Sequence, residues 1–259
     1  MKQSAEMKVA LKAALEAGKI ARKMFGKKIK VKPKGIKGFV TSADFACEKK
    51  IIKVISKKFP GDAFFAEESG KSADEAVREW LIDPIDGTTN FVYGFPFFSV
   101  SIAFAENREV KAGVVFNPVS RNLFSAEKGK GAFLNGKKIH VSGRKKLGDS
   151  IIIAGYPEEP KELVEKSIQI NNELAYTARR VRGMGSAALE MCFVAAGVFD
   201  GFAQISLSPW DYAAAKLIVE EAGGIVTDFN GKKIDLKERH SVCASNRFIR
   251  EELLKKVKV

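Results

Sequence analysis

The chain has 259 residues, of which 46% are hydrophobic and 29% are charged, and its formal net charge is +13. This composition supports a large buried core and excludes an intrinsically disordered chain. No apolar run approaches the roughly 20 residues of a transmembrane helix, and residues 1–23 lack the apolar region of a signal peptide. We therefore expect a soluble cytoplasmic protein without a membrane partner.

The excess positive charge lies at the start of the chain. Residues 1–60 contain 17 Lys and Arg against 4 Asp and Glu, whereas residues 61–259 contain 27 of each. Such a segment suggests a nucleic-acid partner, but residues 26–38 lack interleaved aromatic side chains and no known binding motif is present. We expect no nucleic-acid partner, and a binding titration with a steep salt dependence would contradict this expectation.

Cysteine and histidine are sparse. Cys47, Cys192 and Cys243 are far apart, as are His140 and His240. This usage indicates a reducing compartment and argues against a thiolate or histidine metal site and against a Ser-His-Asp triad. Any chemistry must therefore come from oxygen ligands, while a redox role for Cys47 or Cys192 stays open. The Lys-rich composition, with 3 Gln, favours a thermophilic source.

The first quarter of the chain predicts two helices. Residues 4–25 place small and apolar side chains at helical spacing. The Lys-rich segment 26–38 then predicts either a mobile loop or a short exposed hairpin. Thr41 or Ser42 caps a second helix, which ends near residue 59 and turns Phe45 toward the core.

The rest of the chain changes from strands to alternating strands and helices. Residues 63–139 are rich in β-branched and aromatic runs separated by turn residues, which predicts a meander of adjacent antiparallel strands. From residue 148 the pattern is that of an α/β layer. It predicts strands at 151–156, 178–183, 200–205 and 225–228, and helices at 160–173, 186–199, 210–224 and 246–257.

Together these elements predict a layered α+β fold of the α/β/α/β kind. The half at 1–147 is an antiparallel meander sheet flanked by the two N-terminal helices. The half at 148–259 is an α/β unit with a smaller mixed sheet. We expect the two halves to form one compact unit rather than independent domains.

The most informative stretch is WLIDPIDGTTN at residues 80–90. An apolar strand delivers Asp83, Pro84 keeps it out of a helix, and Asp86 follows before a tight turn at Gly87. Two carboxylates beside free helix N–H groups form a place for a hard cation and a phosphate. The alternative, an Asp cap with a proline turn, is disfavoured by the whole motif although it would explain an isolated Asp-Pro pair.

Other acids repeat the theme, each with a structural alternative. Glu67 and Glu68 end a strand, where paired acids repel one another unless a cation neutralises them; alternatively, they form a solvated strand end. Asp44 and Asp211 lie in first turns of helices, where an acid also serves as an ordinary cap. Gly185-Ser186-Ala187 opens another helix that an anion could approach. Together these groups predict Mg²⁺ and phosphate.

These residues resemble a known family. The segments are GFVTSADFACE, AEESG, WLIDPIDGTTNFVYGFPFFSVSIAF and PWDYAAAKLIVEEAGG. Their order resembles the superfamily of inositol monophosphatases and fructose-1,6-bisphosphatases, which are Mg²⁺-dependent, lithium-sensitive phosphatases. The resemblance covers most of the chain. It implies homodimers, small phosphorylated metabolites as partners, and about two to three Mg²⁺ ions per site, with Mn²⁺ as a substitute.

The resemblance also implies roles for individual residues. One metal would be held by Glu67, Asp83 and the carbonyl of Ile85, and a second by Asp83, Asp86 and Asp211, while Glu67 faces a weaker third site. Asp44 and Thr88 would orient and deprotonate the attacking water. Substrate binding would fall to Asp86, Gly87, Thr88, Gly185, Ser186 and Ala187.

The substrate is less defined than the reaction. Animal inositol monophosphatases carry an acid at the position of Gln204, which here can still bind a hydroxyl. Arg180 is an additional arginine that resembles archaeal and some bacterial members acting on both inositol phosphates and fructose 1,6-bisphosphate, and it could clamp a second phosphate. Alternatively, it is a solvated strand arginine. We expect activity on inositol 1-phosphate and fructose 1,6-bisphosphate, with a 3′-phosphoadenosine 5′-phosphate nucleotidase as the alternative. Lys27 to Lys37 would attract the anionic substrate.

Overall fold

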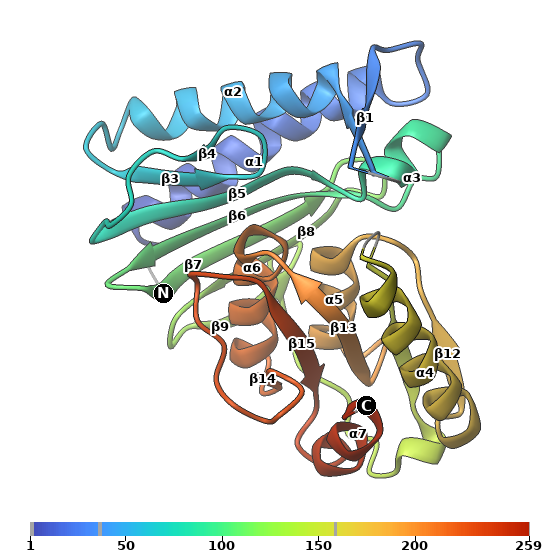
Figure 1. The fold of residues 1–259 in the computed structure, drawn as a ribbon. Helices are drawn as coiled ribbons and strands as arrows, with labels where there is room; N and C mark the ends of the chain where they lie inside the picture. The colour runs from blue at the N-terminus through green and yellow to red at the C-terminus, as the bar shows by residue number, and fades with distance from the viewer. Residues whose placement is uncertain (1–2, 36–37, 158–159, 259) are drawn as a thin grey trace.

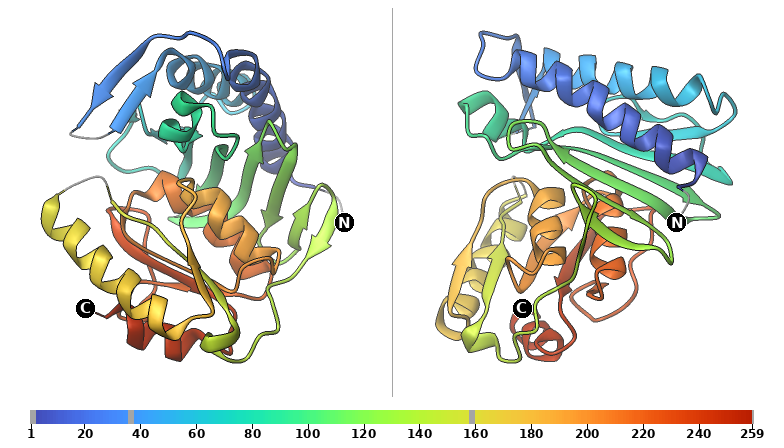
Figure 2. Two further views of the ribbon diagram at one scale, coloured as in Figure 1. Left: turned by 90° about the vertical axis from the view of Figure 1, so that its right-hand side faces the viewer. Right: turned by 180° about the vertical axis from the view of Figure 1, so that it is seen from behind.

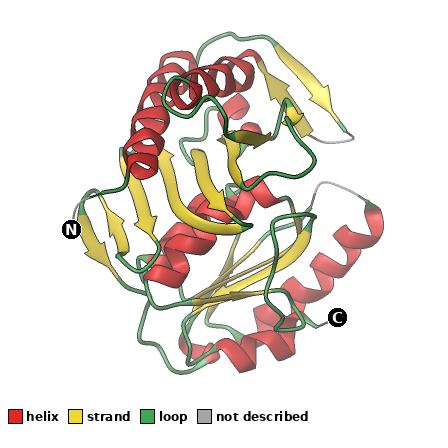
Figure 3. Ribbon diagram, turned by 90° about the vertical axis from the view of Figure 1, so that its left-hand side faces the viewer, coloured by secondary structure: helices red, strands yellow, loops and turns green. Residues whose placement is uncertain are grey.

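The structure is a computed structural model that describes residues 3–35, 38–157 and 160–258. Helices and sheets alternate in five layers (Figures 1 and 3). Two N-terminal helices cover the outer face of a large sheet, two central helices separate it from a small sheet, and two further helices cover the small sheet's outer face. The predicted layered α+β fold is confirmed, with one more helical layer than expected.

The outer helices are α1 (Ala5–Met24) and α2 (Ser42–Ser56). Small residues of α1 allow close packing, and a side chain at Gly18 would lie 2.4 Å from the ring of Phe116. The predicted burial of Phe45 is wrong, because this side chain is 53% exposed and α2 instead buries Cys47, Ile51 and Ile55.

In the sequence, α1 and α2 are joined by the hairpin of β1 (Val31–Lys34) and β2 (Gly38–Thr41). Of the two predictions for this basic segment, the short hairpin is therefore correct. Figure 2 shows it projecting at one end of the helical layer. Lys37 of the proposed substrate-attracting segment lies outside the described residues.

The large sheet has the order β10-β9-β8-β7-β6-β5-β3-β4. Six of its strands form the predicted antiparallel meander. The bounds are β3 Ala63–Ala66, β4 Gly70–Lys71, β5 Arg78–Asp86, β6 Ser99–Glu106, β7 Glu109–Asn117, β8 Asn122–Glu127, β9 Gly131–Leu134 and β10 Lys137–Ile139, with the short helix α3 (Thr88–Tyr93) after β5.

One pairing in this sheet differs from the prediction. β3 and β5 are parallel rather than antiparallel, with Ala66 opposite Ile82. The chain leaves β3 through the hairpin with β4 and then returns to start β5 in the same direction. The carboxyl ends of β3 and β5 therefore meet at one edge, which places Glu67 near Asp83.

The small sheet has the order β12-β11-β13-β15-β14. Its strands β11, β12 and β13 are parallel to one another, and the other pairings are antiparallel. The sequence pattern does not predict the strand β15, which lies between β13 and β14 in the sheet. The bounds are β11 Ile151–Ala154, β12 Arg180–Arg182, β13 Gly201–Leu207, β14 Ile225–Thr227 and β15 His240–Ser245.

The remaining helices complete the layers. The central pair is α5 (Ala187–Ala195) and α6 (Pro209–Glu221), and the outer pair is α4 (Lys161–Thr177) and α7 (Arg250–Val257). A short 3₁₀ turn, Leu147–Asp149, precedes β11. One hydrophobic cluster joins both sheets through the central helices, for example Ala103 and Val115 to Phe202 and Val242. Among the described helices, none has the length and apolar content to cross a membrane.

Candidate active site

A cleft of about 1290 Å³ opens where the edges of the two sheets face each other. From the large sheet it is lined by residues that follow β3 and β5. From the small sheet it is lined by residues at the carboxyl ends of the parallel strands, where ligands of α/β sheets bind. The lining includes Lys34, Glu67, Asp83, Ile85, Asp86, Gly87, Thr88, Asn90, Gly155, Arg182, Gly185, Ala187, Glu190, Gln204, Asp211 and Arg239.

Asp83 and Asp86 come from one irregular strand. β5 continues past Asp83 to Asp86, and its pairing with β6 shifts register between them. A carboxylate oxygen of Asp83 accepts a hydrogen bond from the backbone N–H of Ile85 at 3.0 Å. Both acids are buried, at 2% and 8% exposure. The distortion directs two successive acids to the end of the same strand.

Asp86 holds the start of α5, on the other half of the chain. Its two carboxylate oxygens accept hydrogen bonds from the backbone N–H groups of Ala187 at 3.1 Å and Ala188 at 2.9 Å. It also accepts from the hydroxyl of Ser186 at 2.5 Å. The helix start that was expected to receive an anion already has one, the carboxylate of Asp86. In this structure the N–H groups of Ala187 and Ala188 are therefore engaged by a carboxylate of the chain itself.

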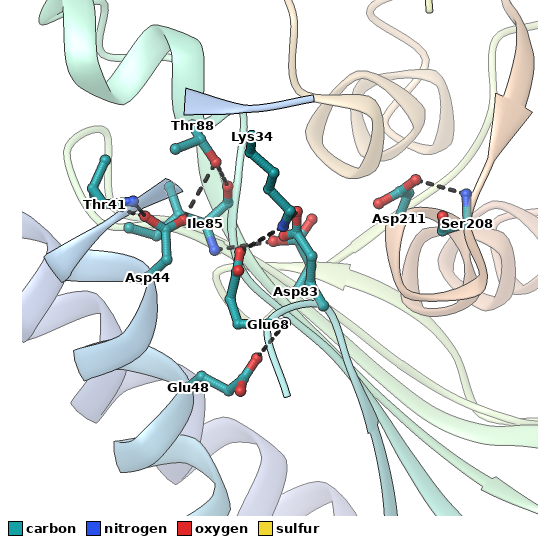
Figure 4. Close-up of polar contacts among 11 residues, drawn as sticks. Lys34, Thr41, Asp44, Glu48, Glu68, Asp83, Ile85, Thr88, Ser208 and Asp211 are labelled. Carbon is teal, nitrogen blue, oxygen red and sulfur yellow. Dashed lines mark hydrogen bonds and ion pairs between the residues drawn. The ribbon is translucent and has the colours of Figure 1, made fainter. Parts of the chain in front are cut away.

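The other two predicted metal ligands come from different elements. Glu67 follows β3, and Asp211 is the third residue of α6. The carboxylate of Asp211 accepts a hydrogen bond from the N–H of Ser208 at 2.7 Å and completes a capping box. Figure 4 shows Asp211 and Ser208 apart from Asp83.

Burial and mutual repulsion act on these acids together. Burial is the largest cause that raises the pKa of Asp83 well above its usual range, and the charges of Glu67, Asp86 and Asp211 add to it. Burial likewise raises the pKa of Asp211, again with Glu67 and Asp86. For Asp86, burial raises the pKa to about 6, while the hydrogen bonds from α5 oppose the shift. The four groups thus lie within each other's electrostatic range.

A lysine already lies among these acids. Lys34, at the end of β1, places its ammonium 2.8 Å from a carboxylate oxygen of Glu67 and 2.9 Å from one of Glu68 (Figure 4). Burial disfavours the charged lysine, but these two carboxylates outweigh it and raise its pKa. Burial also raises the pKa of Glu68 to about 7, an effect that the hydrogen bond from Lys34 opposes. The site is therefore built to hold positive charge.

The donor set fits a hard divalent cation. Every predicted ligand is a carboxylate or a carbonyl oxygen, which is the chemistry that Mg²⁺ prefers. Buried acids that repel one another need a compensating cation, and Lys34 supplies part of that charge. Glu67, Asp83, Asp86, Asp211 and the carbonyl of Ile85 would hold the ion.

Asp44 and Thr88 lie together, as expected for a pair that activates water. The hydroxyl of Thr88 is 3.0 Å from the carbonyl oxygen of Ile85 and 3.3 Å from a carboxylate oxygen of Asp44. The other oxygen of Asp44 accepts from the N–H of Thr41 at 2.8 Å and from its hydroxyl at 2.5 Å. Asp44 is fully buried, and burial raises its pKa, although the hydrogen bonds from Thr41 oppose the shift. A carboxylate with a raised pKa is a better proton acceptor.

Next to this pair, α3 begins inside the cleft. Gly87 precedes it with φ 93°, a backbone conformation that favours glycine. A side chain there would also lie 2.8 Å from the carbonyl oxygen of Gly185. The first N–H groups of a helix have no partner within the helix. The turn at Gly87 and Thr88 therefore offers the donors that α5 does not.

The far end of the cleft contains Gln204 but not Arg180. The amide of Gln204 lies against Gly155, where an added side chain would be 2.6 Å from its oxygen. Arg180 is exposed at the start of β12 and bonds the carbonyl of Arg179. Arg182, at the carboxyl end of β12, lines the cleft instead. Of the two arginines, Arg182 therefore lies on the cleft lining and Arg180 does not.

Sequence reasoning missed several cleft residues. The sequence pattern does not distinguish Lys34 from its neighbouring lysines, nor Arg182 from Arg180 on the same strand. Asn90 belongs to the quoted DPIDGTTN motif, which was the available signal. Glu190 and Arg239 carry no local signal, because only long-range packing brings them to the cleft.

A second group of candidate ligands lies outside the cleft's acidic floor. Donor atoms of Asp235, Glu238 and His240 lie within 4.8 Å of one another. The ring of His240 is already paired with Asp235 at 3.1 Å. This exposed group shows no further feature that points to a bound ion.

Comparisons with known proteins agree with the geometry. The model of the inositol monophosphatase family matches residues 2–259. An inositol-1-monophosphatase of Mesorhizobium japonicum is 40% identical, with 100% of this chain and 98% of the relative covered. A protein named Nus factor SuhB, from Pasteurella multocida, is 38% identical, with 96% and 94% covered.

A solved structure extends the likeness to the fold. The inositol monophosphatase (IMPase) of Thermotoga maritima superposes with a TM-score of 0.91 at 37% identity, covering 98% of this chain and 97% of that one. Sequence, fold and an acidic cleft at the matching motif lead to one conclusion. The chain belongs to the inositol monophosphatase family, whose members are metal-dependent phosphatases.

Proposed function

We propose that the protein is a Mg²⁺-dependent phosphate monoester hydrolase whose substrates are inositol 1-phosphate and fructose 1,6-bisphosphate. The observation that carries this proposal is the acidic cleft itself. Buried Asp83 and Asp86 and half-buried Asp211 line this cleft together with Thr88. The Thr88 hydroxyl bonds Asp44, and α3 begins there with backbone N–H groups that have no partner within the helix. A dianionic phosphate enters such a cleft only when cations offset the carboxylates.

The residues divide the work. Gly87 and Thr88 donate backbone hydrogen bonds to the phosphate. The hydroxyl of Thr88 orients the attacking water, and Asp44 accepts the proton that this water loses. Mg²⁺ bound by the carboxylates, in about two to three sites, would lower the pKa of the water and stabilise the charge on the phosphate oxygens. We expect Mn²⁺ to substitute for Mg²⁺ at the same oxygen ligands, and Li⁺ to inhibit the reaction.

The leaving group lies toward the small sheet. Gln204 can bind a hydroxyl of the polyol, and Gly185 and Ala187 line the same cleft. Arg182 and Arg239 add positive charge at this side, which suits a second phosphate such as that of fructose 1,6-bisphosphate. The Ser186 hydroxyl and the Ala187 N–H are bonded to Asp86. They would contact substrate only if one of these hydrogen bonds to Asp86 were broken.

A substrate panel tests the proposal. Phosphate release is measured from inositol 1-phosphate, fructose 1,6-bisphosphate and 3′-phosphoadenosine 5′-phosphate, with Mg²⁺, with a chelator and with Li⁺. We expect Mg²⁺-dependent release from both sugar phosphates. A kcat/KM on the nucleotide far above both sugars would instead favour the nucleotidase alternative. Arg182→Ala should lower the preference for the bisphosphate, whereas Arg180→Ala should leave it unchanged.

A second candidate function comes from the Pasteurella relative, which is named a Nus factor. That name concerns a role other than hydrolysis, and it weighs against our expectation of small metabolites as the sole partners. The two functions can be separated by experiment, because hydrolysis depends on Asp83 in our proposal. An Asp83→Asn protein that restores a deletion phenotype without hydrolysing phosphate esters would support it.

We also propose that the protein is a cytoplasmic homodimer. Gel filtration with light scattering tests the dimer.

A further inference from the structure

The segment that joins β12 to α5 is held from two sides. Residues 183–186 run along the cleft wall opposite the turn at Gly87. Glu190, one turn into α5, reaches back to them: one carboxylate oxygen accepts hydrogen bonds from the N–H groups of Met184 at 2.5 Å and Gly185 at 3.1 Å. Glu190 is 1% exposed, so these bonds are shielded from water.

Asn90 holds the same segment from the large-sheet side. Its side-chain amide donates to the carbonyl of Met184 at 2.6 Å and to the carbonyl of Phe97 at 2.7 Å. Met184 is thus held at both its N–H and its carbonyl, by side chains from opposite halves of the chain. Gly185 packs directly against Asn90, with 3.2 Å from the position of an added Cβ to the amide nitrogen.

Neither side chain is needed by the chemistry described above. Asn90 and Glu190 line the same cleft, but their side chains hydrogen-bond to backbone groups and not to the metal-binding acids. A buried carboxylate costs free energy unless its hydrogen bonds compensate, and burial raises the pKa of Glu190 to about 7 in spite of the two N–H donors. Such a group calls for a role that offsets its cost.

We propose that Glu190 and Asn90 are positioning residues that set the distance between the phosphate-binding turn and the wall that contacts the substrate's hydroxyls. Loss of either clamp loosens residues 183–185, while the hydrogen bonds from Ser186, Ala187 and Ala188 to Asp86 and the metal-binding acids stay in place. The wall then no longer holds the polyol part of the substrate at a fixed distance from the bound phosphate. This inference rests on the proposed function, since it concerns how that same site chooses its leaving group.

The test compares two substrates in one set of variants. Inositol 1-phosphate presents a polyol to the wall, whereas 4-nitrophenyl phosphate does not. For Glu190→Ala and for Asn90→Ala we expect the ratio of kcat/KM for inositol 1-phosphate to that for the aryl phosphate to fall about tenfold, mainly through KM. Glu190→Gln keeps the accepting oxygen and should restore most of the ratio.

Glu221→Ala is the matched control. The Glu221 carboxylate also bonds two backbone N–H groups in a glycine turn, those of Gly129 and Gly131, both at 2.7 Å, but it lies away from the cleft. It should lower the melting temperature without changing the ratio.

Three results would overturn the positioning role in an active parent protein. They are a parallel fall on both substrates, a Glu190→Gln protein as impaired as Glu190→Ala, or a changed ratio in the control. A parent that releases no phosphate from either substrate would overturn the proposed function and this inference with it.

Discussion

Asp83 and Asp86 are separated by two residues, yet they serve different parts of the molecule. Asp83 bonds the backbone of its own motif at Ile85. Asp86 bonds the start of α5, about a hundred residues further along the chain. The first contact could be predicted from the motif, because Pro84 and the strand end are local signals. The second could not, because it depends on how the two halves pack.

At the same scale, Asp44→Asn tests the proposed proton acceptor. An amide keeps an oxygen for the Thr41 cap but cannot take up a proton. We expect kcat to fall about 10²- to 10⁴-fold, with the melting temperature and the Mg²⁺ requirement nearly unchanged. Steady-state kinetics on inositol 1-phosphate measure this. A kcat within about threefold of the parent would remove Asp44 from the mechanism.

Lys34→Met tests the competition between the lysine and a metal. The ammonium neutralises Glu67 and Glu68, so its removal should strengthen Mg²⁺ binding to the metal-free protein. We expect an increase in affinity of about two- to fivefold, as for a partly exposed ion pair, measured by isothermal titration calorimetry. Lys32→Met, on the exposed part of the same strand, is the control. Weaker binding in Lys34→Met would show that the lysine supports the metal site.

At the scale of elements, direction decides which residues reach the cleft. Arg180 and Arg182 are two residues apart on β12, and at about 3.3 Å per residue they lie about 6–7 Å apart along the strand. Only Arg182 lies at the carboxyl end that borders the cleft. The sequence pattern showed a strand with arginines but not how far along it the cleft begins.

The parallel pairing of β3 with β5 is a second example. Local residues predicted both strands, but the short hairpin at β4 that reverses the chain carries no strong apolar pattern. The strand β15 was missed for a similar reason, since its short run mixes small and polar residues. The longer helices, with their periodic patterns, were predicted with ends that differ by up to four residues from those in the structure, as for α5 and α7.

Packing between the large sheet and α6 allows a stability test. A side chain at Gly113 on β7 would lie 2.7 Å from the backbone oxygen of Ala214. A backbone atom cannot rotate away from such a contact as a side chain can. Gly113→Ala should therefore reduce the free energy of unfolding by about 1–3 kcal/mol. Denaturant titration measures this. Gly143→Ala, with no atom within 4 Å, should change it by less than about 0.5 kcal/mol; equal effects would contradict the packing argument.

At the scale of the whole molecule, the buried acids link stability to pH. Asp86, with a pKa of about 6, and Glu190, with a pKa of about 7, bind protons more tightly in the folded chain than in the unfolded one. Stability should therefore be fully present below about pH 4 for these groups and decline as pH rises through 6 and 7. Mg²⁺ would bind the deprotonated form of Asp86, a proposed ligand, and so offset the part of this loss that Asp86 causes.

Thermal unfolding with and without Mg²⁺ checks the linkage. We expect the rise in melting temperature caused by Mg²⁺ to be several degrees larger at pH 8 than at pH 5.5. Asp83→Asn, which removes one ligand and one buried charge, should shrink the Mg²⁺ effect at both pH values. A Mg²⁺ effect that is larger at pH 5.5 would contradict the assignment of the acids as metal ligands.

The net charge of +13 also has a different meaning at this scale. The excess lies in residues 1–60, which contain α1, α2 and the β1–β2 hairpin, and Lys34 of that hairpin forms ion pairs with Glu67 and Glu68 in the cleft. A basic surface above a site for a cation and an anion favours the capture of small phosphorylated substrates.

In our proposal the carboxylates at the end of β5 create a metal-dependent phosphatase site. The most direct measurement is phosphate release from inositol 1-phosphate by the parent and by Asp83→Asn across a Mg²⁺ titration. We predict saturable Mg²⁺-dependent release by the parent and a loss of at least about 10²-fold in the variant, which added Mg²⁺ does not restore. Release that needs no divalent cation, or that survives in Asp83→Asn, would contradict the claim.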